Sequence, residues 1–349
     1  MGILWNWWGC FNRSITGIFC EKGLFFGGIF MKIVFMEADT LGKDVNLGAF
    51  DAFGEVTVYG KSVPGENAAR IRGADIIVVN KIPLGRELLK DCSQLKLICL
   101  TATGTNNVDF AYMAERGIKV TNVSDYSTDS VAQHTFALLF YLYEKLYFYD
   151  RYVKSGEYVK CDIFSKFDVH FNELSKKRFG IVGLGNIGRK VAGIAKAFGC
   201  DVVYYSTSGT HDDTEYRRVD KETLFGESDI ISIHAPLNDA TRNFVGEREL
   251  SLMKKDAILL NLGRGPIIDE KALAQALLKG EIGGAGLDVL CVEPMAADSP
   301  LLAVKDSTRL IITPHIGWAT VEARQRCVDE VAKNIEAYLA GRERNCVTK

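Results

Sequence analysis

Charge of one sign is nowhere concentrated in this sequence. Its 349 residues hold 42 Lys and Arg against 44 Asp and Glu, a formal net charge of −2, and no basic or acidic run forms a tail. Nucleic acids and anionic membrane surfaces are bound through clustered positive charge. We therefore expect no nucleic acid and no membrane as a partner, and a small molecule instead.

Paired cysteine motifs are also missing. The nine cysteines are an odd number, and no two have the C-x-x-C spacing of a zinc knuckle. Most stand within apolar runs, as Cys99 does in LKLICL, where a thiol behaves as a small hydrophobic side chain. The sequence predicts neither a disulfide framework nor a metal site, and a reducing cytoplasm fits it best.

The first thirty residues carry three of the four tryptophans but lack both a membrane span and a secretory signal. Arg13, Glu21 and Lys22 interrupt their apolar runs, and the order of charged region, apolar core and small-residue cleavage site is absent. Met31 then opens MKIVFMEAD, which is typical of a domain's first strand. We interpret residues 1–30 as an extension outside the fold and Met31 as the natural start; a membrane-contacting arm is the alternative.

From residue 31 onward, short runs rich in Ile and Val alternate with stretches of helical spacing. Continuously apolar strands between helices indicate a parallel sheet covered on both faces. The alternation occurs twice, separated by a long apolar helix predicted over residues 130–154. This predicts an α/β fold of two doubly wound parallel-sheet domains. The last helix, about 320–340, has no obvious place in the second sheet, and we expect it to return to the first domain.

A glycine-rich hexapeptide, GLGNIG at 183–188, opens the second unit. It follows the strand FGIVG directly and begins the helix NIGRKVAGIAKAFG, the context that the dinucleotide-binding fingerprint requires. Gly183 allows the tight turn, Gly185 the approach of the pyrophosphate, and Gly188 close helix–strand packing. The helix N-terminus offers free N–H groups to the phosphates. The alternative is a glycine turn without a ligand; the context favours a Rossmann domain that binds NAD or NADP.

The fingerprint's acidic residue, expected about 20 positions on at the end of the next strand, is absent. Ser206 stands there instead, followed by Thr207 and Ser208, while Arg217 and Arg218 are near in sequence. A carboxylate would repel a 2′-phosphate, and hydroxyls do not. We predict that both cofactors are used, with less than about a hundredfold bias, 2.7 kcal/mol, either way.

Four further segments carry polar residues at predicted strand ends: TATGTNNVD (101–109), NLGRGPIIDE (261–270), GLDVLCVEP (286–294) and TPHIGWAT (313–320). Together with the glycine loop they resemble the D-isomer-specific 2-hydroxyacid dehydrogenase family, closest to its glycerate dehydrogenase/hydroxypyruvate reductase branch. The resemblance runs from about Met31 to the C-terminus. It implies a Rossmann domain of residues 125–315 inserted into a flavodoxin-like substrate domain of residues 31–124 and 316–349. It also implies hydride transfer from NAD(P)H to a small 2-oxo acid, with hydroxypyruvate or glyoxylate favoured.

Three residues would carry the chemistry. Arg264 follows the strand AILLNLG, where its guanidinium can fork onto a carboxylate. His315 follows LIITP, and imidazole exchanges protons near neutral pH. The resemblance makes Arg264 the substrate-binding cation, His315 the general acid/base, and Glu293 the carboxylate that favours the protonated imidazole. Taken singly, each has a plainer interpretation as a loop or packing residue.

The remaining site residues rest mainly on the resemblance. Backbone N–H groups of Thr103, Gly104 and Thr105 would form a nest for the substrate carboxylate, with Thr103 also near the cofactor. Trp318 would wall the pocket and favour a short substrate. Further cofactor contacts would come from the glycine loop and from strand ends, with Asp288 and His315 near the nicotinamide: Asn186, Ile187, Ser206, Thr207, Ala235, Pro236, Leu262 and Gly263.

Two other activities and one assembly remain to be weighed. Formate dehydrogenation is a sister activity, but those enzymes carry Gln beside the histidine, where this chain has Glu293. A co-repressor-like scaffold would retain Arg, Glu and His, but this chain lacks a charged or disordered extension for recruiting partners. We also predict a homodimer built partly on the helix at 130–154, because the run LYFYDRY at 146–152 exceeds what one core face needs.

Overall fold

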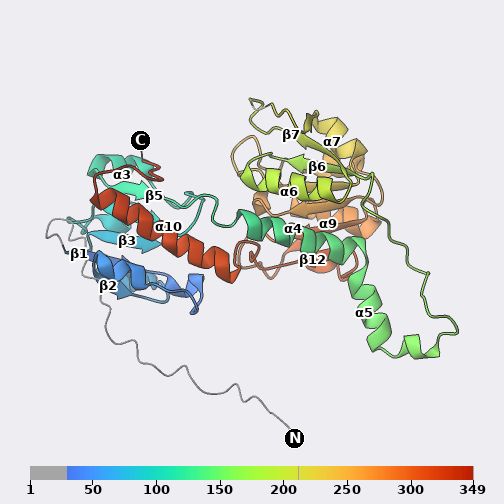
Figure 1. Cartoon of the computed structure of the whole chain (residues 1–349), viewed down its shortest axis with the longest axis horizontal. Coiled ribbons are helices and arrows are strands. Elements are labelled where there is room, and N and C mark those ends of the chain that lie inside the picture. Colours follow the sequence, from blue (N-terminus) through green and yellow to red (C-terminus); the bar gives the residue numbers. More distant parts are fainter. Residues whose placement is uncertain (1–29, 211, 349) are drawn as a thin grey trace, which may run out of the picture.

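The chain folds into two lobes, each built around one parallel sheet (Figure 1). The computed structural model describes residues 30–210 and 212–348. The interpretation of residues 1–30 as an extension therefore lies, apart from Phe30, outside the described residues. Within the described residues, no helix is both long and apolar enough to cross a membrane.

The sheet of the first lobe has five parallel strands in the order β2-β1-β3-β4-β5. This is the flavodoxin-like order that the sequence predicts. The central strands are buried along their whole length, which explains their uninterrupted apolar runs. The strands are β1 (Met31–Phe35), β2 (Gly54–Val58), β3 (Ile76–Val79), β4 (Leu97–Leu100) and β5 (Lys119–Thr121).

Helices cover both faces of the first sheet. One face carries α1 (Pro64–Ile71), α2 (Arg86–Leu89) and α3 (Phe110–Arg116). The other is covered by the short helices η1 (Ala38–Leu41) and η2 (Gly48–Ala52) and by the last helix, α10 (Val321–Leu339).

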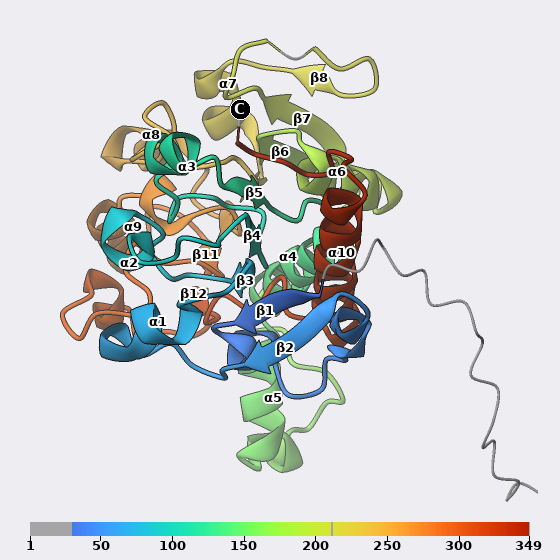
Figure 2. The ribbon, with the colours of Figure 1, turned by 90° about the vertical axis from the view of Figure 1, so that its left-hand side faces the viewer.

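Helix α10 is separated from this sheet in sequence but packed on it in space. Its Cys327, Val328 and Val331 are fully buried together with Ile33 and Ile76 of the sheet. Figures 1 and 2 both show α10 lying along the first lobe. Of the shorter elements in this lobe, η2 is a 3-10 helix and α2 is a single turn.

The sheet of the second lobe has seven parallel strands in the order β12-β11-β10-β9-β6-β7-β8. The first six in sequence follow the Rossmann order, and β12 extends the edge. The two-residue strand β8 has no apolar signal and was not expected from the sequence. The strands are β6 (Arg178–Val182), β7 (Asp201–Tyr205), β8 (Arg217–Arg218), β9 (Ile230–Ile233), β10 (Ile258–Asn261), β11 (Gly284–Leu287) and β12 (Leu310–Ile312).

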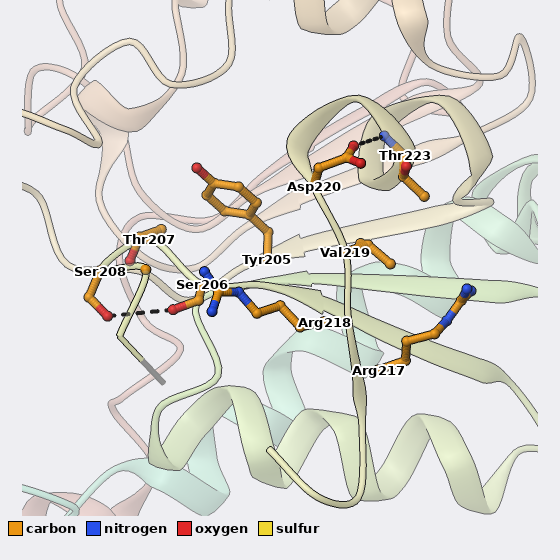
Figure 3. A pocket seen from close by; sticks show the side chains of 10 residues that line it. Tyr205, Ser206, Thr207, Ser208, Arg217, Arg218, Val219, Asp220 and Thr223 are labelled. Atoms are coloured by element: carbon orange, nitrogen blue, oxygen red, sulfur yellow. Dashed lines mark hydrogen bonds between the residues drawn. The ribbon is translucent and has the colours of Figure 1, made fainter. Parts of the chain in front are cut away.

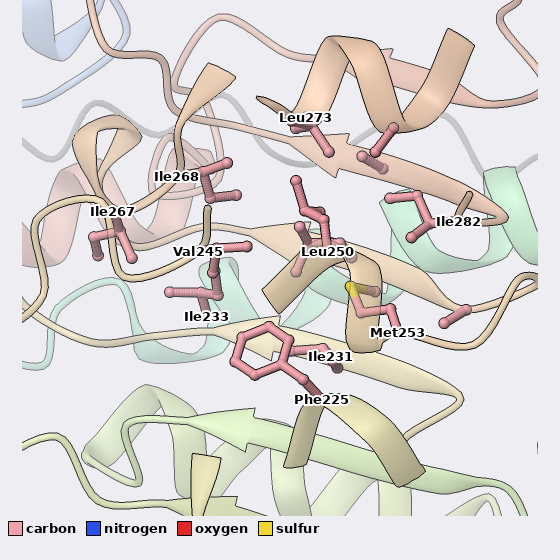
Figure 4. Close-up of a cluster of buried hydrophobic side chains, with 14 of the residues drawn as sticks. Phe225, Ile231, Ile233, Val245, Leu250, Met253, Ile267, Ile268, Leu273 and Ile282 are labelled. Atoms are coloured by element: carbon pink, nitrogen blue, oxygen red, sulfur yellow. The ribbon is translucent and has the colours of Figure 1, made fainter. Parts of the chain in front are cut away.

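Two layers of helices sandwich this second sheet. One layer is α7 (Lys221–Glu227), α8 (Glu247–Leu252) and α9 (Glu270–Lys279), whose buried cluster around Phe225 and Ile231 is shown in Figure 4. The other layer is α4 (Thr128–Tyr143) and α6 (Asn186–Ala197). Short 3-10 helices η4 (Gly265–Ile267) and η5 (Pro300–Ala303) fill the connections.

The single helix predicted over residues 130–154 is wrong: it is two helices. Helix α4 ends at Tyr143, Lys145 adopts a left-handed backbone with φ 56°, and α5 (Leu146–Lys154) follows. The apolar stripe of α4 is buried against the second sheet, including Phe136 and Leu139. Helix α5 has no buried residue and, with η3 (Glu157–Lys160), projects from the lobe as an arm (Figure 1). The helix breaks at the point where its apolar stripe no longer packs against the second sheet.

Candidate active site

The loops that follow β6, β9 and β10 touch one another at the carboxyl edge of the second sheet. Gly183 has φ +90°, and a Cβ there would lie 2.9 Å from the Cα of Ala235. A Cβ on Gly263 would lie 2.9 Å from the carbonyl oxygen of Ala235. The predicted cofactor residues of these three loops are therefore close neighbours, at the edge where open α/β sheets bind their ligands.

The glycine loop has the shape that a pyrophosphate requires. A Cβ on Gly188 would approach the carbonyl oxygen of Gly183 to 2.2 Å, whereas a Cβ on Gly185 would meet open space. Helix α6 begins directly after Gly185, and no side chain of its N-cap binds the first N–H groups. Those N–H groups and the helix dipole are thus available to an anion. The residues present fit a dinucleotide cofactor.

The side chain of Asn186 ties this loop to the segment that connects the two lobes. Its amide donates to the carboxylate of Asp125, which lies on the segment between β5 and α4. The predicted cofactor contact of Asn186 is therefore a matter for its backbone N–H, at the start of α6. Ile187 packs at the border of the core beneath it.

His315 and Glu293 form a hydrogen-bonded pair. The imidazole Nδ1 donates to Glu293 Oε2 over 2.8 Å, and the other carboxylate oxygen accepts the backbone N–H of Leu290 at 2.9 Å. Burial acts to raise the pKa of Glu293, but the bonds from His315 and Leu290 outweigh it and hold that pKa below its ordinary value. With Nδ1 committed to the carboxylate, Nε2 is the nitrogen left for proton exchange with a ligand.

The backbone around His315 is fixed by Asp288, which is only 3% exposed. One carboxylate oxygen of Asp288 accepts from Thr313 Oγ1 at 2.7 Å and from Ile316 N at 2.8 Å, and the other accepts from Gly317 N at 2.8 Å. His315 itself has φ 55° and donates its N–H to the Asp288 carbonyl oxygen at 2.8 Å. The loop that presents the imidazole is therefore wrapped around one buried carboxylate.

The structure gives Asp288 hydrogen-bond partners that the sequence does not predict. Burial acts to raise the pKa of Asp288, but hydrogen bonds from His134, Thr313 and the loop backbone outweigh it and lower that pKa. His134, on α4, lies 2.9 Å from Thr313 Oγ1 and 3.4 Å from Asp288 Oδ1 through its Nε2. His134 thus supports the loop that carries His315, and the nicotinamide contact of Asp288 stays a prediction.

Arg264 reaches across to the first lobe. Its Nη1 donates to the carbonyl oxygen of Gly263 at 2.8 Å, and the Asn261 side chain holds the Arg264 carbonyl oxygen at 3.0 Å. A Cβ on Gly104 would lie 2.8 Å from Arg264 Nη2, so the guanidinium lies against the predicted backbone nest. The arginine and the loop at 103–105 are thus brought together from separate sheets.

Thr103, Thr105 and Trp318 are the other predicted substrate-binding residues. Thr103 uses its hydroxyl to donate to the Val123 carbonyl oxygen at 2.8 Å, so its side chain anchors the loop. Trp318 packs between the cores of both lobes, and its ring meets that of Tyr126 edge-on at 6.2 Å. Thr105 lies on the same loop, where its carbonyl oxygen accepts the N–H of Val108.

The three predicted catalytic residues leave from neighbouring strands of one sheet. Arg264 follows β10, Glu293 follows β11 and His315 follows β12, and these strands are adjacent. A Cβ on Gly265 would lie 1.9 Å from the carbonyl carbon of Leu290, so the first two loops are in contact. A forked cation and a proton-exchanging imidazole held by a carboxylate therefore face the same edge, an arrangement suited to a carbonyl acid.

Comparison with known proteins decides the family. Residues 136–317 match the model of the D-isomer specific 2-hydroxyacid dehydrogenase NAD binding domain. A glycerate dehydrogenase of Methylorubrum extorquens is 37% identical over 90% of this chain and 98% of its own length. A hydroxypyruvate reductase of Blautia hydrogenotrophica is 36% identical over 91% of this chain and 100% of its own. The chain belongs to the D-isomer specific 2-hydroxyacid dehydrogenase family.

The solved structures agree with this assignment. An acyclic imino acid reductase in complex with NADPH and D-Arg superposes with a TM-score of 0.81 at 31% identity, over 91% of this chain and 100% of that one. This dehydrogenase is therefore an NAD(P)-dependent oxidoreductase with two α/β domains, as the sequence predicts.

At the end of β7 the dehydrogenase has a cavity of about 780 Å³. Ser206 and Thr207 line it, as the predicted contacts of the cofactor ribose require, and Ser206 is buried. The opposite wall includes Arg217 and Arg218 of β8 (Figure 3). The parallel pairing of β8 with β7 brings both arginines to this cavity.

Proposed function

We propose that this dehydrogenase reduces a short 2-oxo acid, hydroxypyruvate or glyoxylate, to the D-2-hydroxy acid. The observation that carries the proposal is the His315–Glu293 pair at the same sheet edge as Arg264, which lies against Gly104 of the other lobe. The relatives named glycerate dehydrogenase and hydroxypyruvate reductase support the same substrate class.

In the proposed reaction each residue has a separate task. The bound cofactor supplies the hydride to C2 of the 2-oxo acid. Arg264 binds the substrate carboxylate through its forked N–H groups, together with backbone N–H groups of the 103–105 loop. His315 gives the proton on Nε2 to the oxygen that gains negative charge, and water later restores that proton. Glu293 stabilises the protonated imidazole before the transfer.

The substrate would be short because Trp318 stands between the lobes. Its ring is fixed by contacts with both cores and by Tyr126, so we propose that it closes the substrate space beside Arg264. A rigid aromatic wall admits a two- or three-carbon acid and disfavours longer side chains.

The decisive experiment measures initial rates on a panel of 2-oxo acids with NADH and NADPH in parallel, with the product resolved by chirality. We expect turnover of glyoxylate and hydroxypyruvate, D-glycerate as the product of the latter, and a loss of about 10²–10⁴-fold in kcat for His315→Ala. Oxidation of formate without reduction of any 2-oxo acid, or no turnover at all, would favour the formate dehydrogenase-like or scaffold alternative.

We infer that two copies of the chain pair through the arm. The stripe of α4 is used by its own core, so the surface left for a partner is α5 and the segment after it. Phe164 is 90% exposed and Phe167 68% exposed. Val153 and Ile163 are also exposed. An apolar group of this size on a projecting arm is typical of a symmetric interface.

We also propose the domain boundaries that the family resemblance implies, after residues 124 and 315. They are supported by the two sheets, whose strands lie within 31–121 and 178–312. Next to the second boundary, Ser130 Oγ of α4 donates to the Gly317 carbonyl oxygen at 2.6 Å. A cytoplasmic location is proposed on the unpaired cysteines alone.

A further inference from the structure

The cavity at the end of β7 contains a positively charged side chain. The position of that residue in the sequence does not predict its presence there. Strand β8 pairs in parallel with β7, with Arg217 opposite Val203 and Arg218 opposite Tyr204. Successive side chains of a strand point to opposite sides. Figure 3 accordingly shows the Arg218 side chain extending toward the loop that follows β7, while Arg217 extends the other way. One arginine of the pair is therefore directed at the loop that follows β7.

That loop presents hydroxyl groups toward the same place. Ser206 Oγ lies 3.5 Å from Ser208 Oγ, which lies 3.0 Å from Thr210 Oγ1. The turn is closed by the Gly209 N–H, which donates to the Ser206 carbonyl oxygen at 3.3 Å. A Cβ on Gly209 would lie 3.8 Å from Arg218 Nη2, so the loop and the guanidinium share one space.

Two carboxylates stand near, Asp220 in the wall of the cavity and Asp212 next to Arg218, and both have partners in the structure. Asp220 caps α7 by accepting the N–H of Thr223 at 2.7 Å. Asp212 accepts from Arg218 Nη1 at 3.0 Å, but its side chain is 87% exposed. A surface pair of this kind is weak, so a doubly charged phosphate competes for Arg218 successfully.

We infer that this cavity binds the 2′-phosphate of NADPH, with Arg218 as the cation and the Ser206 and Ser208 hydroxyls as donors. The end of this strand is where a Rossmann fold holds the adenosine ribose. The inference rests on the proposed function only in using the same cofactor site. It makes NADPH the tighter cofactor, and so gives a direction to the prediction from the loop sequence, which is use of both cofactors with less than about a hundredfold bias either way.

The test is calorimetric binding of NADPH and NADH to the full chain without any 2-oxo acid. Wild type should bind NADPH at least about tenfold more tightly, since a hydrogen-bonded charge pair contributes about 10- to 100-fold. Arg218→Gln should lose most of that ratio while NADH affinity stays within about twofold. Arg86→Gln, at an exposed arginine of α2 in the first lobe, is the control and should keep the ratio.

A second variant guards against a loss of folding in the first. Ser206→Asp should reverse the preference by weakening NADPH and sparing NADH. Equal affinities in wild type, or equal losses in Arg86→Gln and Arg218→Gln, would overturn the inference. Because no substrate is present, a protein that discriminates the cofactors but reduces no 2-oxo acid would refute the proposed function and leave this inference standing.

Discussion

At the scale of single residues, Glu293 sets the charge beside the imidazole. Its lowered pKa means that it stays ionised at every pH above its ordinary value of about 4.3, and its contribution is lost only as pH falls through the lower folded value. In Glu293→Gln the protonated imidazole loses this anion. The kcat for reduction should then fall, because the proton donor is less stabilised. An unchanged kcat would show that His315 does not depend on this carboxylate.

Arg264 acts through its shape as well as its charge. Lysine at this position keeps one positive charge but loses the fork that lies against Gly104. Arg264→Lys should lower kcat/KM for the best 2-oxo acid by about 10- to 100-fold, roughly 1.4–2.7 kcal/mol of transition-state binding. Arg248→Lys, on the exposed surface of α8, is the control and should leave kcat/KM unchanged. Equal behaviour of the two variants would place the substrate carboxylate elsewhere.

At the scale of elements, the loop after β12 depends on Asp288. Asparagine offers one acceptor where the carboxylate offers two, so the Gly317 N–H would be left facing an amide donor. Asp288→Asn should lower the free energy of unfolding by about 1–3 kcal/mol and reduce kcat, because the loop carries His315. Urea unfolding at pH 7 measures the first effect. Asp306→Asn, an exposed aspartate that also accepts a local N–H, should change stability by less than about 0.5 kcal/mol.

The pH dependence gives this prediction a sign. Asp288 has a lowered pKa in the folded protein, so its stabilisation is complete above the unfolded-state value of about 3.9 and is lost as pH falls through the lower folded value. The stability difference between wild type and Asp288→Asn should be constant from pH 5 to 8 and shrink below about pH 4. A difference that grows below pH 4 would contradict this sign.

Elements with a strong apolar pattern are the ones that sequence predicts well. The buried strands and the glycine loop follow directly from continuous apolar runs and from spacing. Strand β8 consists of two arginines, so only its pairing with β7 reveals it. The break at Lys145 is equally silent, because the aromatic run continues through α5. The partners of Asp288 in the loop after β12 lie 25 to 29 residues away in sequence, and no local pattern encodes such contacts.

At the scale of the whole molecule, we expect the arm to mediate the pairing of two copies of the chain. Phe164→Glu combined with Phe167→Glu should convert a dimer into a monomer of 38.6 kDa, measured by light scattering at micromolar concentration. Leu278→Glu, on the exposed face of α9, is a matched control because this leucine is 58% exposed and remote from the arm in sequence. A wild-type protein that is already monomeric would refute the proposed dimer.

The path of the chain through the lobes bears on how the protein is made. The second lobe is continuous in sequence from β6 to β12, but the first needs α10, which follows β5 by about 200 residues. A ribosome adding 5–20 residues per second takes roughly 10–40 s to cover that interval. Throughout it, the nascent chain holds the sheet face of Ile33, Ile76 and Leu97 without its last helix. The part of the enzyme that is synthesised first is thus the part that is completed last, and chaperones have that time in which to act on it.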